Sequence, residues 1–107
     1  MNNHKIIFND IDWTNAGVGV RYKAYINSGK RLRLVEFSEG FIELDWCTHG
    51  HSGIVLEGSF AIDYNGNIER YSKDDVIFIP NGEDDRHKAI INKGEKVMLL
   101  LFELLEG

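Results

Sequence analysis

The chain has 107 residues, of which 43% are hydrophobic and 11% aromatic, and this is the composition of a folded globular protein. The length predicts a single domain covering residues 1–107, because two cores would each bury too little apolar surface to offset the entropy of ordering. Acidic residues outnumber basic residues by 17 to 12 and no long basic run occurs, which argues against a nucleic-acid partner.

The compartment is predicted from the cysteine content and from the apolar runs. The one cysteine allows no internal disulfide, and the first ten residues lack the apolar core of a signal peptide. No stretch of the sequence approaches the roughly 20 apolar residues that a membrane-spanning helix needs. We therefore expect a soluble, cytoplasmic protein without a membrane partner.

The first third of the chain predicts three strands. Residues 6–8 form a short apolar run and predict an edge strand. Residues 18–26 and 31–37 alternate apolar and polar side chains on either side of a turn sequence, and predict an antiparallel pair. The basic residues on this pair form either a cationic rim for an anionic ligand or a solvated outer face, and we favour the solvated face. They are Arg21, Lys23, Arg31 and Arg33.

Residues 40–58 carry the densest set of candidate functional side chains. Residues 43–47 alternate in character, which predicts a strand whose polar face points into the protein. A turn then leads into an apolar strand that ends at Gly58. An inward polar face is costly unless it binds something. The candidate metal ligands in this stretch are Asp45, Cys47, His49 and His51.

The second half of the chain predicts short strands joined by tight turns. Asn65-Gly66 lies between two alternating runs and predicts a two-residue β-hairpin, because both central residues of a type I′ turn need positive φ. An apolar strand at 76–79 ends at the only proline, residues 86–92 alternate again, and residues 97–105 predict a buried strand. Nine or ten such strands without a convincing helix are typical of a sandwich or barrel.

Two motifs in the sequence resemble those of the cupin family. The first cupin motif has two histidines one residue apart, followed at fixed spacing by a glutamate and a glycine, and it supplies three ligands to one metal. Aligned on Gly58, this sequence has Asp45 and Cys47 at the histidine positions and His51 at the glutamate position. The resemblance covers about residues 18–103.

The second motif of the family is matched by Pro80-Asn81-Gly82, which follows an apolar strand. Asp85 stands where the fourth metal ligand is usually found, and His87 follows two residues later. Because alternate residues of a strand share a face, both side chains are expected to point into the barrel.

The resemblance implies an all-β fold, a double-stranded β-helix or jelly-roll barrel. It also implies a homodimer, because cupins commonly pair and the apolar strand at 97–105 leaves one face in need of a partner. The limited core of a barrel of this size favours the same assembly. The apolar positions expected to pack the barrel are Leu44, Trp46, Ile54, Leu56, Phe60, Ile62, Phe78 and Leu99.

The resemblance further implies a metal-dependent function. A divalent ion, either zinc, nickel or iron, is expected in the barrel beside a small polar ligand, and the family's isomerases, dioxygenases and decarboxylases indicate the type of reaction. The candidate metal ligands are Cys47, His51 and His87, with His49, Asp45 or Asp85 to complete the shell. The alternative is a metal-free module that binds or senses a small molecule without catalysis. In that module the histidines are only hydrogen-bonded, the cysteine packs as a small hydrophobe and the carboxylates are solvated.

Overall fold

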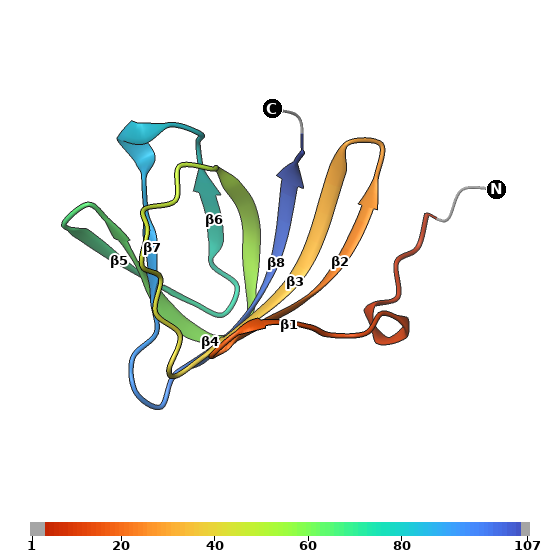
Figure 1. The fold of residues 1–107 in the computed structure, drawn as a ribbon, viewed down its shortest axis with the longest axis horizontal. Helices are drawn as coiled ribbons and strands as arrows, with labels where there is room; N and C mark the ends of the chain where they lie inside the picture. The colour runs from red at the N-terminus through yellow and green to blue at the C-terminus, as the bar shows by residue number, and fades with distance from the viewer. Residues whose placement is uncertain (1–3, 106–107) are drawn as a thin grey trace.

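The computed structural model describes residues 4–105, which form eight strands and two short 3-10 helices. In chain order these are η1 (Phe8–Asp10), β1 (Thr14–Gly17), β2 (Val20–Asn27), β3 (Lys30–Ser38), β4 (His51–Tyr64), β5 (Asn67–Ser72), β6 (Val76–Ile79), η2 (Glu83–Asp85), β7 (Lys88–Ile90) and β8 (Lys96–Leu104). The strands pair antiparallel, and the predicted all-β fold is confirmed (Figure 1). Within these residues no helix has the length and apolar character needed to span a membrane.

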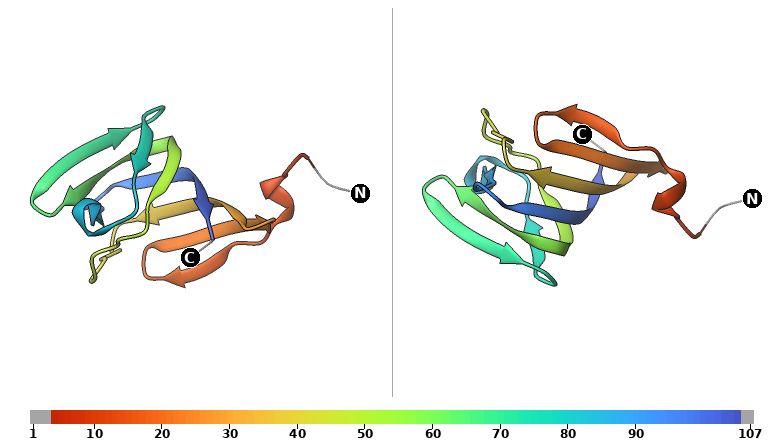
Figure 2. Two further views of the ribbon diagram at one scale, coloured as in Figure 1. Left: turned by 90° about the horizontal axis from the view of Figure 1, so that it is seen from above. Right: turned by 90° about the horizontal axis from the view of Figure 1, so that it is seen from below.

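Strand β4 organises the sheet. A path of hydrogen-bonded strands runs β1-β2-β3-β8-β4-β5, and β6 and β7 both pair with β4. The first part of β4 pairs with β8 and β6, and its second part pairs with β5 and β7. Figure 2 shows the β4–β5 hairpin and strands β1 to β3 on opposite sides of the molecule. The sheet therefore curls over on itself, as in the predicted jelly-roll barrel.

A glycine lets β4 pass from one side of the barrel to the other. The pairing of β4 with β8 shifts register between Val55 and Glu57, and Gly58 follows with φ of 79°. A Cβ atom at Gly58 would lie 1.8 Å from the carbonyl oxygen of Lys96. Only glycine tolerates both the left-handed conformation and this close approach, so the last glycine of the first motif has a structural role.

The turn between β4 and β5 is the one that the sequence predicts. Asn65 and Gly66 have φ values of 56° and 103°, as both central residues of a type I′ turn require. The Gly66 N–H donates to the Asp63 carboxylate at 2.6 Å, which closes the turn from its own strand. The predicted hairpin is confirmed.

The core consists of inward side chains from β3, β4, β6 and β8. Its buried members are Val35, Val55, Phe60, Ile62, Ile77, Ile79, Val97, Leu99 and Leu101. Burying one such side chain stabilises the fold by about 1.5–3 kcal/mol. The predicted burial of Phe60, Ile62 and Leu99 is confirmed.

Other predicted core positions lie on outward faces. The exposed fraction is 80% for Leu44, 78% for Phe78 and 37% for Trp46, so their assignment to the core is wrong. Ile54 and Leu56 are half-buried. Leu44 and Trp46 lie in an irregular segment where strand alternation does not apply, and β6 is apolar on both faces, so its sequence does not say which face is inward.

The N-terminal residues 6–8 do not form the predicted edge strand. Residues 6 and 7 are irregular, and Phe8 begins η1. The Lys23 ammonium group on β2 donates to the Phe8 carbonyl oxygen at 2.8 Å. A buried lysine therefore fixes this segment against the sheet where strand pairing was expected.

Residues 43–47 are also irregular, which corrects the strand predicted there. Two isolated bridges, Ile42 to Ile90 and Cys47 to His87, join this part of the chain to the region of β7. Between the bridges the Ala89 N–H donates to the Glu43 carboxylate at 2.8 Å. A side chain thus replaces the backbone acceptor that a regular ladder would supply.

Candidate metal centre and cavity

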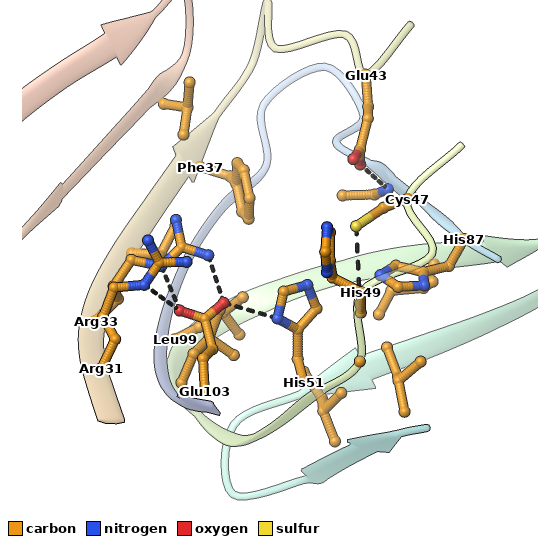
Figure 3. A pocket seen from close by; sticks show the side chains of 18 of the residues that line it. Arg31, Arg33, Phe37, Glu43, Cys47, His49, His51, His87, Leu99 and Glu103 are labelled. Atoms are coloured by element: carbon orange, nitrogen blue, oxygen red, sulfur yellow. Dashed lines mark hydrogen bonds and ion pairs between the residues drawn. The ribbon is translucent and has the colours of Figure 1, made fainter. Parts of the chain in front are cut away.

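The curled sheet encloses a cavity of about 500 Å³. Most of the residues that line it are apolar, and the polar ones include two groups that are central to its chemistry (Figure 3). We call Cys47, His51 and His87 the thiol–imidazole triad. We call Arg31, Arg33 and Glu103 the arginine–glutamate cluster.

The thiol–imidazole triad is assembled from three separate parts of the chain. His51 begins β4, Cys47 lies in the irregular segment 41–50, and His87 lies just before β7. The Cys47 N–H donates to the His87 carbonyl oxygen at 2.9 Å, and the His87 N–H donates to the Cys47 carbonyl oxygen at 3.0 Å. One ligand atom from each of the three side chains lies within 4.8 Å of the other two.

His87 is oriented by a backbone carbonyl group. Its Nδ1 lies 3.0 Å from the Asp85 carbonyl oxygen, which can only accept, so Nδ1 carries the proton and Nε2 carries the lone pair. The residue is 5% exposed, and Nε2 is a buried atom without a hydrogen-bond partner among residues 4–105. A buried lone pair without a partner is costly, and a metal ion would satisfy it.

The Nδ1 atom of His51, like that of His87, lies beside an oxygen atom, here of a carboxylate group. This Nδ1 lies 2.8 Å from Glu103 Oε2, an ion-pair distance, although the approach is not that of an aligned hydrogen bond. The ring centroids of His51 and His87 are 5.4 Å apart, in an edge-to-face arrangement. Both imidazoles therefore have an oxygen acceptor at Nδ1, which leaves Nε2 as the ligating atom.

The arginine–glutamate cluster is buried around its carboxylate. Glu103 accepts from Arg31 Nε at 2.8 Å, from Arg33 Nε at 2.8 Å and from Arg33 Nη2 at 2.7 Å. Burial alone would raise the pKa of Glu103, but the contacts with His51 and the arginines outweigh it and hold the pKa well below its usual range. Glu103 is thus an anion that connects the arginines to the triad.

Cys47 is a protonated thiol unless a cation replaces its proton. Burial raises the pKa of the Cys47 thiol, and the negative charge of Glu43 adds to the shift. Its sulfur lies 3.7 Å from the His49 carbonyl oxygen. Glu43 also lines the cavity, as expected for the polar face of residues 43–47, although it was not among the predicted metal ligands.

The other predicted ligands lie outside the triad. His49 is exposed but lines the cavity. Asp45 is exposed at a bend in segment 41–50. Asp85 ends η2, so the strand parity that predicts a shared face with His87 does not apply there, and that prediction is wrong. Asp85 contributes its backbone carbonyl to His87 instead.

The sequence interpretation that places Arg31 and Arg33 on a solvated outer face is wrong, because both line the cavity. The signal that identifies them is parity, since they share a strand face with Val35, which is 2% exposed. In the same way, Glu103 shares a face of β8 with the buried Leu101. A charged residue that shares a strand face with buried residues is therefore the pattern that indicates a charged group inside the cavity.

The donor set of the triad fits a divalent ion. One thiolate and two imidazoles suit zinc, nickel and iron, and three protein ligands leave another position open. Metal–ligand bonds of about 2.0–2.3 Å place the ligands of a tetrahedral ion about 3.4–3.8 Å apart. The ligand atoms of the triad lie within 4.8 Å of one another, so closure by at most about 1 Å brings them to this spacing. The unpartnered Nε2 of His87 is the observation that favours an ion over a hydrogen-bonded network.

No protein-family model and no curated protein matches the sequence. Among solved structures, the polyketide cyclase RemF from Streptomyces resistomycificus matches with a TM-score of 0.80 and 19% identity, covering 98% of this chain and 81% of that chain. KdgF from Halomonas sp. matches with a TM-score of 0.75 and 21% identity, covering 94% and 93%. An RmlC-like cupin from Shewanella frigidimarina matches with a TM-score of 0.76 and 17% identity, covering 98% and 93%.

This chain has the cupin fold. At these identities the likeness establishes the fold, and the resemblance predicted from the two motifs is confirmed at that level. In this fold, Cys47 and His51 of the thiol–imidazole triad come from the segment of the first motif, and His87 comes from the segment of the second. Glu103 and the arginines come from strands that neither motif covers.

Proposed function

We propose that this cupin-fold protein binds a divalent metal ion through Cys47, His51 and His87 and holds a small polar molecule beside it in the cavity. The observation that carries the proposal is the buried, unpartnered Nε2 of His87 next to two other metal-ligating side chains. Zinc is the first ion to test, and nickel and iron suit the same donors.

The chain's own residues prepare this site. The Asp85 carbonyl group fixes the ring of His87, and the Glu103 carboxylate lies 2.8 Å from Nδ1 of His51. The apolar walls restrict water around the bound molecule. A divalent ion with an open position supplies a Lewis acid for a carbonyl or hydroxyl oxygen.

Such a site suits enzymes that isomerise, cyclise or decarboxylate small molecules. A polyketide cyclase and a putative mannose-6-phosphate isomerase are among the structures that the chain matches. For this chain, enzymatic activity is part of the proposal. The single-domain organisation and the cytoplasmic location stay predictions.

The test is the metal content of protein purified without an affinity tag. We expect about one ion per chain in the wild type, and loss of the ion in His51→Ala and in His87→Ala. Cobalt loading gives an independent readout, because thiolate-to-cobalt charge-transfer absorption is expected in the wild type and not in Cys47→Ser. Asp45→Asn is the matched control, since Asp45 lies nearby and outside the triad. An ion that stays bound in both histidine variants would show that the ligands are not those of the triad. If the wild type itself holds no ion, the metal-free binding module replaces this proposal.

Metal binding is expected to weaken in acid. The thiol and both imidazoles must lose their protons before they ligate, and burial makes the Cys47 proton harder to remove. Dialysis at stepwise lower pH, followed by metal analysis, measures this loss. A metal content that does not change with pH would point to ligands other than the triad.

We also propose that the protein is a homodimer that pairs through the outer face of β6, β4 and β8. Phe78 on β6 and Phe102 on β8 both lie opposite Ser52 of β4, and they are 78% and 49% exposed. Val76 on the same face is 68% exposed. An exposed apolar face of this kind is suited to pairing with its own copy about a two-fold axis. Light scattering is expected to give about twice the chain mass of 12.2 kDa, and Phe78→Glu is expected to give a monomer.

A further inference from the structure

Two arginines face the interior of the cavity from the regular strand β3. The side chains of Arg31 and Arg33 are 31% and 21% exposed, and both donate to the carboxylate of Glu103. Figure 3 shows this cluster on one side and the thiol–imidazole triad on the other, with His51 reaching toward Glu103 between them. The two guanidinium groups carry two positive charges, and the carboxylate of Glu103 neutralises only one of them.

Hydrogen-bond donors remain on both guanidinium groups. A guanidinium group carries five N–H donors in a planar fork. Glu103 accepts from Nε of Arg31 and from Nε and Nη2 of Arg33. Both Nη groups of Arg31 and Nη1 of Arg33 take no part in these hydrogen bonds. Because Glu103 already holds both side chains in place, a ligand that uses these donors loses little affinity to side-chain ordering.

The charges that line the cavity do not balance once a divalent ion is bound. Arg31 and Arg33 contribute two positive charges, and the ion contributes two more. Glu43, Glu103 and the thiolate of Cys47 contribute three negative charges. One positive charge is left in partly dry surroundings, and a ligand with a single negative charge neutralises it.

We propose that the ligand of the cavity is a small organic monocarboxylate, with its carboxylate on Arg31 and Arg33 and a second oxygen-bearing group facing the triad. This inference deepens the proposed function and rests on it for the charge balance. Apolar lining residues such as Phe37 and Leu99 are available to an apolar or aromatic body. The cavity of about 500 Å³ has room for a small aromatic acid.

The test is a calorimetric titration of the zinc-loaded protein with two matched compounds. One is 3-benzoylpropionate, and the other is butyrophenone, which has a methyl group in place of the carboxylate. We expect the carboxylate to bind at least about tenfold more tightly, because charge-assisted hydrogen bonds are lost in the ketone. Phenyl phosphate is titrated as a third compound, and its dianion is expected to bind more weakly.

Variants of the arginines locate the carboxylate. Arg31→Gln is expected to weaken binding of 3-benzoylpropionate about ten- to a hundredfold and to leave butyrophenone unaffected. Arg33 still holds Glu103 in this variant, so zinc content is expected to stay the same. Arg33→Lys keeps the positive charge without the planar guanidinium group, and it is expected to reduce the affinity for 3-benzoylpropionate less than Arg31→Gln does. Arg70→Gln, outside the cavity on β5, is the control and is expected to change neither affinity.

Equal affinities for the carboxylate and the ketone would overturn the inference, as would wild-type affinity in Arg31→Gln. Tighter binding of phenyl phosphate would overturn the assignment to carboxylates. Zinc content, measured in the same samples, separates this inference from the proposed function. Zinc binding without carboxylate binding refutes the inference alone. Carboxylate binding that depends on Arg31 in protein that takes up no zinc refutes the metal function and supports the carboxylate site.

Discussion

The two sides of the cavity are built in different ways. Strands β3 and β8 pair along their whole lengths in constant register, and this pairing places the arginine–glutamate cluster on their inner faces. Segment 41–50 contacts the region of β7 through two isolated bridges, and it carries Cys47. The cluster is therefore positioned by a continuous ladder, and the thiol by a few local hydrogen bonds.

Because of this difference, substitutions in the two sides of the cavity are expected to differ in their effect on the stability of the fold. A change in the β3–β8 wall disturbs buried charges within the main sheet, so it is expected to act on folding as well as on the site. A change in segment 41–50 is expected to act on the geometry of the triad and to leave the walls in place. The variants below test this division, in order of decreasing expected effect.

Replacing Glu103 by alanine is expected to have the largest effect, because it removes the partner of Arg31, Arg33 and His51 together. Breaking a buried ion pair costs about 3–5 kcal/mol, and the partial exposure of both arginines reduces this to about 2–3 kcal/mol of unfolding free energy. Metal affinity is expected to fall about ten- to a hundredfold, because His51 loses its orienting carboxylate. Urea denaturation and metal titration measure the two effects.

The matched control is Glu57→Gln on β4, where the carboxylate is 71% exposed. Its unfolding free energy is expected to stay within about 0.5 kcal/mol of the wild type. If Glu103→Ala proves as stable as this control, the regular wall does not depend on the buried carboxylate and the comparison fails.

Glu43→Ala is expected to loosen segment 41–50 while the walls stay folded. The Ala89 N–H loses its acceptor, which costs about 1–2 kcal/mol. The amides of Cys47 and His87 are then expected to exchange hydrogen faster, with little change in β3 and β8. Hydrogen-exchange measurements on zinc-free protein show this directly. Glu43→Gln keeps a carbonyl oxygen for the same hydrogen bond, and similar exchange in both variants would rule out the proposed role of the bond.

The parts of the fold that could be predicted depend on local signals. The alternation of residues 18–26 and 31–37 predicts β2 and β3, and Asn65-Gly66 predicts the hairpin turn from the φ values that its two residues allow. The spacing of the first motif identifies Cys47 and His51, whereas that of the second identifies Asp85, two residues before the His87 that lies in the triad. These predictions are possible because each depends on residues that are close together in the sequence.

The parts that could not be predicted depend on which face of a strand is buried and on where a strand ends. Arg31 and Arg33 alternate in the same way whether they face solvent or the cavity, and only their parity with buried Val35 distinguishes the two. The parity argument also fails at Asp85, because η2 interrupts the extended backbone. Tertiary contacts decide both points, and a single sequence does not contain them.

The smallest predicted effect concerns the outer side of the same regular wall. Glu36 on β3 is 8% exposed, accepts a hydrogen bond from Arg21 Nε at 2.8 Å and lies 3.7 Å from Lys96 Nζ. The hydrogen bond from Arg21 lowers the pKa of Glu36 from its usual 4.5, against the opposing effect of burial. Arg21 is 44% exposed, so water weakens this pair relative to the cluster in the cavity.

The direction of the pH dependence follows from the lowered pKa. Because Glu36 releases its proton more readily in the folded chain than in the unfolded one, its carboxylate stabilises the fold above the usual pKa of 4.5. This contribution is lost as the pH falls below that value. Glu36→Gln is expected to be less stable than the wild type by about 1 kcal/mol at pH 7, and the difference is expected to shrink as the solution is acidified. Urea denaturation of both proteins across the acidic range measures it, and a difference that stays constant below pH 4.5 would show that the Arg21–Glu36 pair does not stabilise the outer side of the wall.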